Sequence, residues 1–178
     1  MKFAGFTLLE TMAVIVLFAT CVTAAVPTFA AWRMRDQVDA RANALLGTFS
    51  YARSEAIRRK TRITVCRIDA ARRCLATGKA CPSGLADWSC GWAVVAEQAG
   101  ANVLLRAQPA LDEIAIASTL TALTFTPPAG QTIGSLRNFD IAPRVTTAST
   151  RSAAWRRCLR VAAGGRARVS EGACGAAS

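Results

Sequence analysis

A long apolar segment near the start of the chain is the strongest constraint on its fold. Residues 6–31 are apolar or small and polar, and they include one charged residue, Glu10. A helix that crosses a bilayer needs about 20 consecutive apolar residues, so this segment is long enough to span one. The sequence therefore predicts a membrane-spanning helix over 6–31, preceded by a short leader over 1–5.

A secretory signal peptide is the alternative interpretation of this segment. Such a peptide has a shorter apolar core and ends in small residues, and Thr23, Ala24 and Ala25 could form its cleavage site. Two features favour the spanning helix. Glu10 lies near the start of the run, where a buried charge is costly and usually functional. The run also continues without a break into an amphipathic stretch.

Residues 32–60 have the spacing of an amphipathic helix. Apolar side chains recur every three or four residues and form one face, made of Val38, Ala42, Leu45, Leu46, Phe49, Ala52 and Ile57. Charged side chains mostly take the other face: Arg33, Asp36, Arg41, Arg53, Glu55, Arg58 and Arg59. We expect the apolar face to pack on a globular domain formed by 61–178.

Short strands are expected after residue 60. Eight segments are partly β-branched and are bounded mostly by Gly, Pro, Asn or Ser: 62–68, 91–97, 102–108, 113–117, 122–126, 137–141, 155–162 and 167–170. Many consecutive short strands favour antiparallel sheets, here arranged as a small sandwich. Residues 142–154, rich in Thr, Ser and Arg, are expected to form a surface loop.

The seven cysteines divide into one in the apolar segment and six in the region that follows. We expect Cys21 to be a free, small residue of the helix. The six others are even in number, as in proteins of oxidising compartments: Cys66, Cys74, Cys81, Cys90, Cys158 and Cys174. Spacing alone leaves many pairings open; we expect Cys158 to pair with Cys174 and the other four to pair among themselves. Without a Cys-x-x-Cys pair, zinc is disfavoured.

The chain is strongly basic and contains no histidine. It has 22 Lys and Arg against 11 Asp and Glu, a formal net charge of +11. This balance favours a polyanionic partner, such as DNA, RNA, acidic lipid or an acidic protein surface. Because the commonest general base and metal ligand is missing, we expect no enzyme activity, no metal and no cofactor.

Arginines crowd into the last part of the chain. They are Arg151, Arg156, Arg157, Arg160, Arg166 and Arg168. Gly165 precedes the last two, and residues two apart share a face of a strand, so Arg166 and Arg168 are expected to project together. Guanidinium groups bind phosphate oxygens in pairs, and glycine permits close backbone approach. A solvated basic strand that guards a sheet edge against aggregation is the alternative.

The start of the chain resembles the prepilin cleavage motif of type IV pilins and type II secretion pseudopilins. The string is Gly5-Phe6-Thr7-Leu8-Leu9-Glu10. The resemblance implies cleavage between Gly5 and Phe6 by a prepilin peptidase, and N-methylation of Phe6. It also implies that Glu10 pairs with the terminal ammonium of a neighbouring subunit, which would set the register of a filament, and that Pro27 loosens the helix.

The whole chain resembles the FimT/GspH family of minor pilins and type II secretion pseudopilins. Besides the leader, the resemblance rests on Arg-Ser-Glu-Ala-Ile-Arg-Arg at 53–59, on Gly91-Trp92 and on the terminal Gly-Arg-x-Arg. It implies an α+β fold, with a long N-terminal helix packed on a globular domain of two antiparallel β-sheets. It also implies a single-pass protein of the bacterial inner membrane with a periplasmic head, which then joins other pilin subunits in a filament.

Two hypotheses for function follow from this resemblance. Some FimT-type minor pilins bind DNA for natural transformation through a Gly-Arg-x-Arg motif, which Gly165, Arg166 and Arg168 match. The first hypothesis is a minor pilin that binds extracellular DNA without sequence preference through this motif and the neighbouring arginines. The second is a structural minor pilin or secretion pseudopilin that primes filament assembly or protein secretion without binding DNA.

Overall fold

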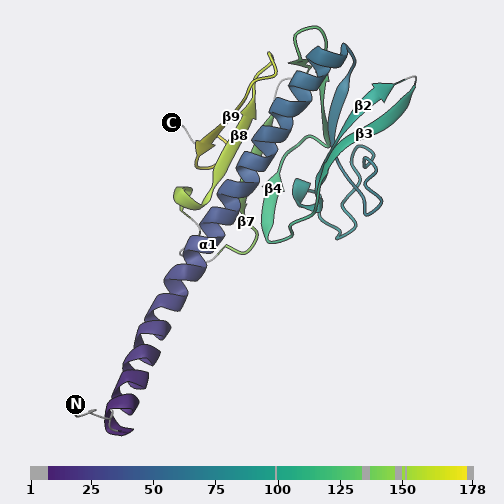
Figure 1. Cartoon of the computed structure of the whole chain (residues 1–178). Coiled ribbons are helices and arrows are strands. Elements are labelled where there is room, and N and C mark those ends of the chain that lie inside the picture. Colours follow the sequence, from purple (N-terminus) through teal and green to yellow (C-terminus); the bar gives the residue numbers. More distant parts are fainter. Residues whose placement is uncertain (1–7, 99, 134–136, 147–149, 151, 176–178) are drawn as a thin grey trace, which may run out of the picture. The chain divides into compact units, whose positions relative to one another are not determined.

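The computed structural model describes residues 8–98, 100–133, 137–146, 150 and 152–175, apart from the side chains of 24–28 (Figure 1). The chain divides into two compact units, residues 1–36 and residues 37–178, and each is described by itself. One long helix, α1 (Leu8–Arg59), contributes to both. Two 3-10 helices, η1 (Trp88–Cys90) and η2 (Ala153–Trp155), lie in the second unit.

The first unit is the N-terminal part of α1. Thr11, Thr20 and Thr23 each donate their hydroxyl hydrogen to the carbonyl three residues earlier, at 2.8, 2.8 and 2.9 Å. These bonds satisfy the hydroxyls within the helix itself. The rings of Phe29 and Trp32, one turn apart, have centroids 5.9 Å from each other. Among residues with described side chains, no helix has both the length and the hydropathy required for a membrane crossing.

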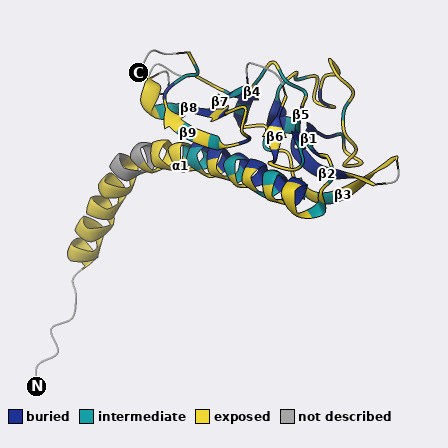
Figure 2. Ribbon diagram, turned by 90° about the horizontal axis from the view of Figure 1, so that it is seen from above, coloured by how far each residue is buried: buried dark blue, intermediate teal, exposed yellow. Residues whose placement is uncertain are grey.

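The second unit begins with the C-terminal half of α1, which packs on the β-rich region along one buried stripe (Figure 2). The apolar members of this stripe recur at helical spacing: Val38, Ala42, Leu45, Phe49, Ala52 and Ala56. The amphipathic pattern therefore predicts correctly which side of the helix faces the domain.

The buried stripe is wider than the apolar pattern indicates. Arg41 and Glu55, which the sequence places on the solvent face, are only 6% and 7% exposed, whereas Ile57 is 43% exposed and Leu46 is half-buried. Arg41 is covered from the β-rich region, where its guanidinium lies over the ring of Trp92 in β2 (Trp92–Gln98). Glu55 is bound by Arg58 and Arg59 of its own helix. Arg41 donates to the carbonyl of Pro109 at 2.8 Å. Burial lowers the pKa of the Arg41 guanidinium.

Two antiparallel sheets form the β-rich region, as the fold class predicted. The first has the strand order β3-β2-β1-β5-β6 and the second β4-β7-β8-β9. Their bounds are β1 (Ile63–Arg67), β2 (Trp92–Gln98), β3 (Ala101–Gln108), β4 (Ile114–Ala117), β5 (Ala122–Thr126), β6 (Gln131–Thr132), β7 (Asn138–Pro143), β8 (Arg157–Val161) and β9 (Ala167–Glu171). Each of the eight predicted segments overlaps one strand, although β2, β7 and β9 end one or two residues later than predicted. The two-residue β6 was not predicted, because it is too short to show an alternating pattern.

An aromatic cluster joins the helix to both sheets. The ring centroid of Phe49 in α1 lies 6.1 Å from that of Phe125 in β5 and 5.0 Å from that of Phe139 in β7. Trp88 meets Phe139 edge-on at 5.1 Å. All four rings are fully buried, and burial of each contributes about 2–3 kcal/mol. Phe49 therefore holds the two sheets on one helix.

Three disulfides brace the second unit. Cys66–Cys74 and Cys81–Cys90 close the long loop between β1 and β2, and Cys158–Cys174 joins β8 to the segment after β9. The last pair is the one expected for the final hairpin. Cys21 is exposed and unbonded.

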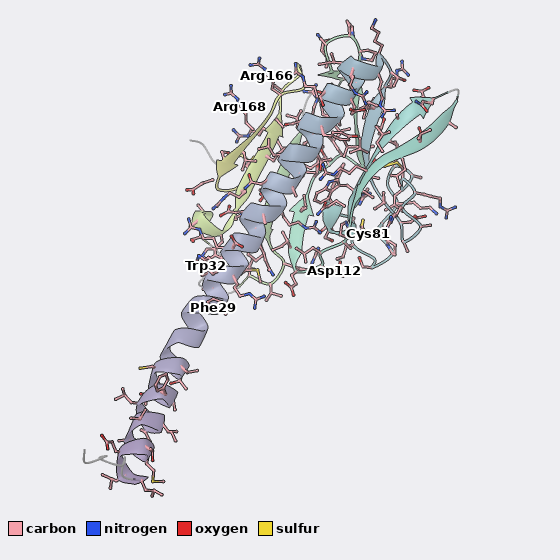
Figure 3. The ribbon with its side chains drawn as sticks, viewed as in Figure 1. Phe29, Trp32, Cys81, Asp112, Arg166 and Arg168 are labelled. Atoms are coloured by element: carbon pink, nitrogen blue, oxygen red, sulfur yellow. A yellow bond between two sulfur atoms is a disulfide. The ribbon has the colours of Figure 1, made fainter. Side chains whose placement is uncertain are left out.

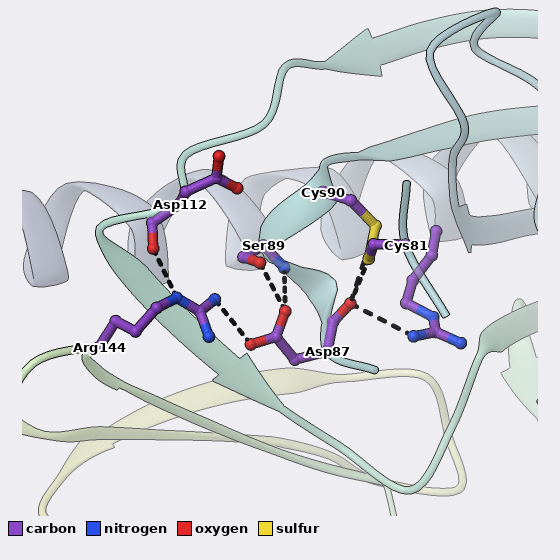
Figure 4. Close-up of polar contacts among 7 residues, drawn as sticks. Cys81, Asp87, Ser89, Cys90, Asp112 and Arg144 are labelled. Carbon is purple, nitrogen blue, oxygen red and sulfur yellow. Dashed lines mark hydrogen bonds and ion pairs between the residues drawn. A yellow bond between two sulfur atoms is a disulfide. The ribbon is translucent and has the colours of Figure 1, made fainter. Parts of the chain in front are cut away.

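Asp87 connects the disulfide loop to the second sheet (Figure 4). Its carboxylate accepts the backbone N–H of Ser89 at 3.0 Å and a guanidinium N–H of Arg144 at 2.8 Å. Arg144 follows β7 and also donates to the carbonyl of Asp112 at 2.6 Å. This ion pair gives the loop a fixed position on the domain.

Candidate polyanion-binding site

The candidate site lies on the last hairpin of the second sheet, whose edge strand is β9. In β8, Leu159 and Val161 are buried, whereas Arg160 between them is exposed. Arg160 lies directly opposite Arg168 of β9, so both side chains project from the outer face. Arg166 stands two residues before Arg168 and shares that direction. Figure 3 shows Arg166 and Arg168 pointing away from the hairpin.

A close contact between two glycines fixes the turn of this hairpin. Gly165 has φ of +76°, and a Cβ on it would lie 1.9 Å from the carbonyl oxygen of Gly130. A Cβ on Gly130 would in turn lie 2.6 Å from Cγ of Arg53. The turn is therefore pressed against the loop after β5 and against α1. Packing and backbone conformation therefore explain why position 165 is a glycine, and contact with a ligand is not needed to explain it.

Three arginines of the hairpin form no ion pair with any described residue. Within the described part of the chain, Arg160, Arg166 and Arg168 have no acidic partner, although other arginines do. Like charges directly opposite each other, as in Arg160 and Arg168, destabilise a sheet by about 0.5 kcal/mol. The cluster therefore creates a positive potential that suits an anionic ligand.

The same three arginines border a groove of about 560 Å³ on the outer face of the sheet. A fourth, Arg137, also lines this groove but is itself only 6% exposed. Its Nη2 donates to the carbonyl of Thr132 at 3.1 Å, while its buried Nε has no partner. Among the described residues, neither acidic nor aromatic ones line the groove. It can therefore accept phosphate oxygens, but it offers no ring for base stacking.

Two arginines that the sequence places in the same cluster are used in other contacts. Arg156 forms a two-pronged ion pair with Asp140 of β7, at 2.7 and 3.3 Å. Arg157 is buried and pairs with Asp39 of α1, where its Nη2 lies 3.1 Å from Oδ2. Both guanidiniums hold β8 to its neighbours, whereas the sequence placed them with the arginines expected to face DNA. Arg151 lies outside the described residues.

The structure also brings in two residues that the sequence did not single out for binding. Arg137 was predicted as the first residue of a strand. Arg53 was assigned to the charged helix face and to the string at 53–59 on which the family resemblance rests. Both reach the hairpin through the fold, since Arg53 lies 112 positions before Gly165 in the chain. No local pattern marks either residue, because the proximity depends on how the helix and both sheets pack.

The remaining predicted site residues lie at the start of the chain. Gly5 and Phe6 lie outside the described residues, and Glu10 lies in the first turn of α1. Within the described residues no cluster of His, Cys, Asp or Glu could hold a metal ion.

Comparisons with known proteins identify one family and two solved structures with the same fold. The family model described as type II transport protein GspH matches residues 41–165, a range that ends just before Arg166. Two crystal structures of the Pseudomonas aeruginosa (strain PAO1) type IV minor pilin FimU share the fold at 20% sequence identity. The form in space group P65 has a TM-score of 0.53 and covers 74% of this chain and 91% of that one. The form in space group P21 has a TM-score of 0.56, with 76% and 90% covered. The search of curated proteins gave no match.

Proposed function

The chain belongs to the GspH family of type II transport proteins, and on this premise we propose that it is a minor type IV pilin that binds extracellular DNA. The observation that carries the proposal is the cluster of Arg160, Arg166 and Arg168, which border one groove without an acidic partner in the described residues. In this role the subunit is incorporated into a pilus and supports DNA uptake in natural transformation.

The chemistry of the groove favours binding to the phosphate backbone. Guanidinium groups contact phosphate oxygens in pairs, and such contacts carry no base information. Aromatic rings would be needed to stack the bases of a single strand, and none lines the groove. Binding should therefore be independent of sequence and weaken as salt is added.

In this role the N-terminal segment delivers the subunit to the filament. A prepilin peptidase cleaves between Gly5 and Phe6 and methylates Phe6, and the apolar segment 6–31 holds the subunit in the inner membrane before assembly. Glu10 then pairs with the terminal ammonium of a neighbouring subunit, because a charge left unpaired in an apolar filament core is costly. The three disulfides support a periplasmic location for the head.

Mass spectrometry of the native protein tests this processing. We expect a mature chain that begins at methylated Phe6. A chain that retains residues 1–5 would contradict the proposed route into the filament.

A structural role without DNA is the second candidate, and the family match itself favours it. The matched family is described as a type II transport protein, and its model does not reach Arg166. In that case the subunit primes a pseudopilus and is required for protein secretion. Deletion of the gene would then abolish release of secreted proteins, while substitutions in the hairpin would have no effect.

A binding assay with the full chain in a non-ionic detergent separates the two candidates. Fluorescence anisotropy of a labelled duplex is measured with the native chain and with the double variant Arg166→Gln/Arg168→Gln. Both side chains are exposed, so the variant should fold normally, and we expect its affinity to fall at least about tenfold. Equal affinity in a folded double variant would exclude DNA binding at this site.

A further inference from the structure

Arg166 and Arg168 also border a second groove, on the other side of the hairpin from the one described above. This groove has a volume of about 380 Å³, and its opposite wall is the last part of α1. Ser50, Arg53 and Ser54 line that wall, and their spacing of three and four residues places them on one face of the helix. The edge strand β9 therefore has an arginine-lined groove on each side.

The helix-side groove has the composition of a phosphate site. Three arginines and two serines line it, and none of the described residues that line it is acidic. Arginine guanidiniums and serine hydroxyls are among the side-chain donors that contact nucleic-acid phosphates. No aromatic ring lines the groove, so it does not provide a surface for stacked bases.

Arg53 is held in place before any ligand arrives. Its stem packs against the backbone of Gly130 and Gly165, where a Cβ on Gly165 would lie 3.1 Å from Arg53 Cδ. One Nη donates to the carbonyl of Ala129 at 3.3 Å, and its buried Nε has no partner. A guanidinium that is positioned by packing, and that has no acidic partner among the described residues, loses little entropy when it binds an anion.

We infer that this helix-side groove is a second phosphate-binding site, and that a DNA backbone crosses the edge strand β9 with phosphates on both sides of it. Arg53 is the binding residue that the helix contributes. This inference rests on the proposed DNA-binding function and extends it from one sheet face to the helix. The ligand is a linear phosphate polymer, recognised by charge and not by its bases.

Charge removal at Arg53 tests the inference in the full chain. Arg53→Gln keeps the stem that packs on the two glycines and removes the charge. Arg106→Gln removes the same charge from an exposed position of the edge strand β3 that lines neither groove, and it serves as the control. We expect Arg53→Gln to weaken duplex binding about three- to tenfold and to reduce the slope of log affinity against log salt by about 0.9, the value for one phosphate. Arg106→Gln should leave the slope unchanged.

A second pair of variants keeps the test valid if Arg53→Gln does not fold. Ser50→Glu places an acid in the groove at an exposed helix position, and Ser83→Glu makes the same change at an exposed position of the disulfide loop. Only Ser50→Glu should weaken binding, by about threefold or more.

The outcomes distinguish this inference from the function on which it rests. Unchanged affinity and slope in folded Arg53→Gln, or in Ser50→Glu, would overturn the second site if Arg166→Gln/Arg168→Gln still loses binding. If the double variant also binds normally, the proposed function fails, and the second site fails with it.

Discussion

The two ends of the β8–β9 hairpin contain the same residue type in opposite roles. At the open end, Arg156 and Arg157 are paired with Asp140 and Asp39, and a disulfide lies beside them. At the turn end, Arg160, Arg166 and Arg168 have no acidic partner in the described residues. The two groups are separated by only a few residues of sequence.

This difference shows that arginine density does not identify a binding site. A guanidinium that is buried or paired with a carboxylate is already used in holding the fold, and it cannot turn to a ligand without loss of stability. At the turn end, Arg160 and Arg168 are like charges in directly opposite positions of adjacent strands, which destabilises the sheet. Because these arginines do not stabilise the fold, they are the better candidates for binding a ligand. If this division is right, substitutions at the open end should affect stability, and substitutions at the turn end should affect DNA binding.

The largest effect on stability is expected at the turn itself. Gly165→Ala should reduce the free energy of unfolding by about 3 kcal/mol or more, because the new Cβ would meet the carbonyl of Gly130 at positive φ. Gly164→Ala is the matched control, since a Cβ there meets nothing within 4 Å. Chemical denaturation of the two variants measures the difference. Similar stabilities would show that the turn is not pressed against the loop.

The open end should give the next largest effect. Arg157→Gln should lower the free energy of unfolding by about 2 kcal/mol, since it removes a buried guanidinium bound to Asp39 and to the carbonyls of Ala154 and Arg156. Arg160→Gln, three residues later, should stay within about 0.5 kcal/mol of the native chain. If Arg160→Gln were the more destabilising, the division between the two ends would be wrong.

DNA binding should depend more on the turn end than on the open end. Arg160→Gln should weaken duplex affinity by about threefold to tenfold, whereas Arg156→Gln should change it by less than about twofold, because Arg156 faces Asp140. Both variants remove one positive charge, so a long-range effect of net charge would act equally on them. Equal losses in an anisotropy titration would mean that only total charge matters.

The smallest effect concerns the end of α1, where a carboxylate is paired as at the open end of the hairpin. Hydrogen bonds from Arg58 and Arg59 lower the pKa of Glu55 from 4.5 to about 2. A lowered folded-state pKa stabilises the fold above the unfolded pKa, and this stability is lost as pH falls from about 4.5 towards 2. The loss should be about 1 kcal/mol, since Arg58 is largely exposed. Glu55→Gln should remove this part of the acid dependence in thermal unfolding; an unchanged profile would contradict the assignment.

Much of the fold could be predicted because its signals are local. The helical spacing of Val38, Ala42 and Leu45 shows which face of α1 is buried, and short β-branched segments show the strands. The closeness of Cys158 and Cys174 around one hairpin made their disulfide foreseeable. The fold class, with two antiparallel sheets, followed from the family resemblance.

The candidate site was harder to predict, because its contacts are distant in sequence. Arg157 and Asp39 are 118 residues apart, and no sequence pattern indicates that they meet. Arg41 and Glu55 have the spacing of solvent-facing charges, yet both are buried. Arg41 lies against Trp92 and Pro109, which are distant in sequence, and Glu55 lies against Arg58 and Arg59. The motif around Gly165 was visible, but the glycine itself is explained by its contact with Gly130.

The salt dependence of duplex binding by the native full chain tests the central claim most directly. Contacts from the three hairpin arginines, and from Arg53, predict a slope of log affinity against log salt between about −2.7 and −3.6. The slope should become shallower by about 1.8 in Arg166→Gln/Arg168→Gln. A native slope near zero, or the same slope in both proteins, would contradict the claim that the unpaired arginines at the hairpin turn bind a phosphate polymer.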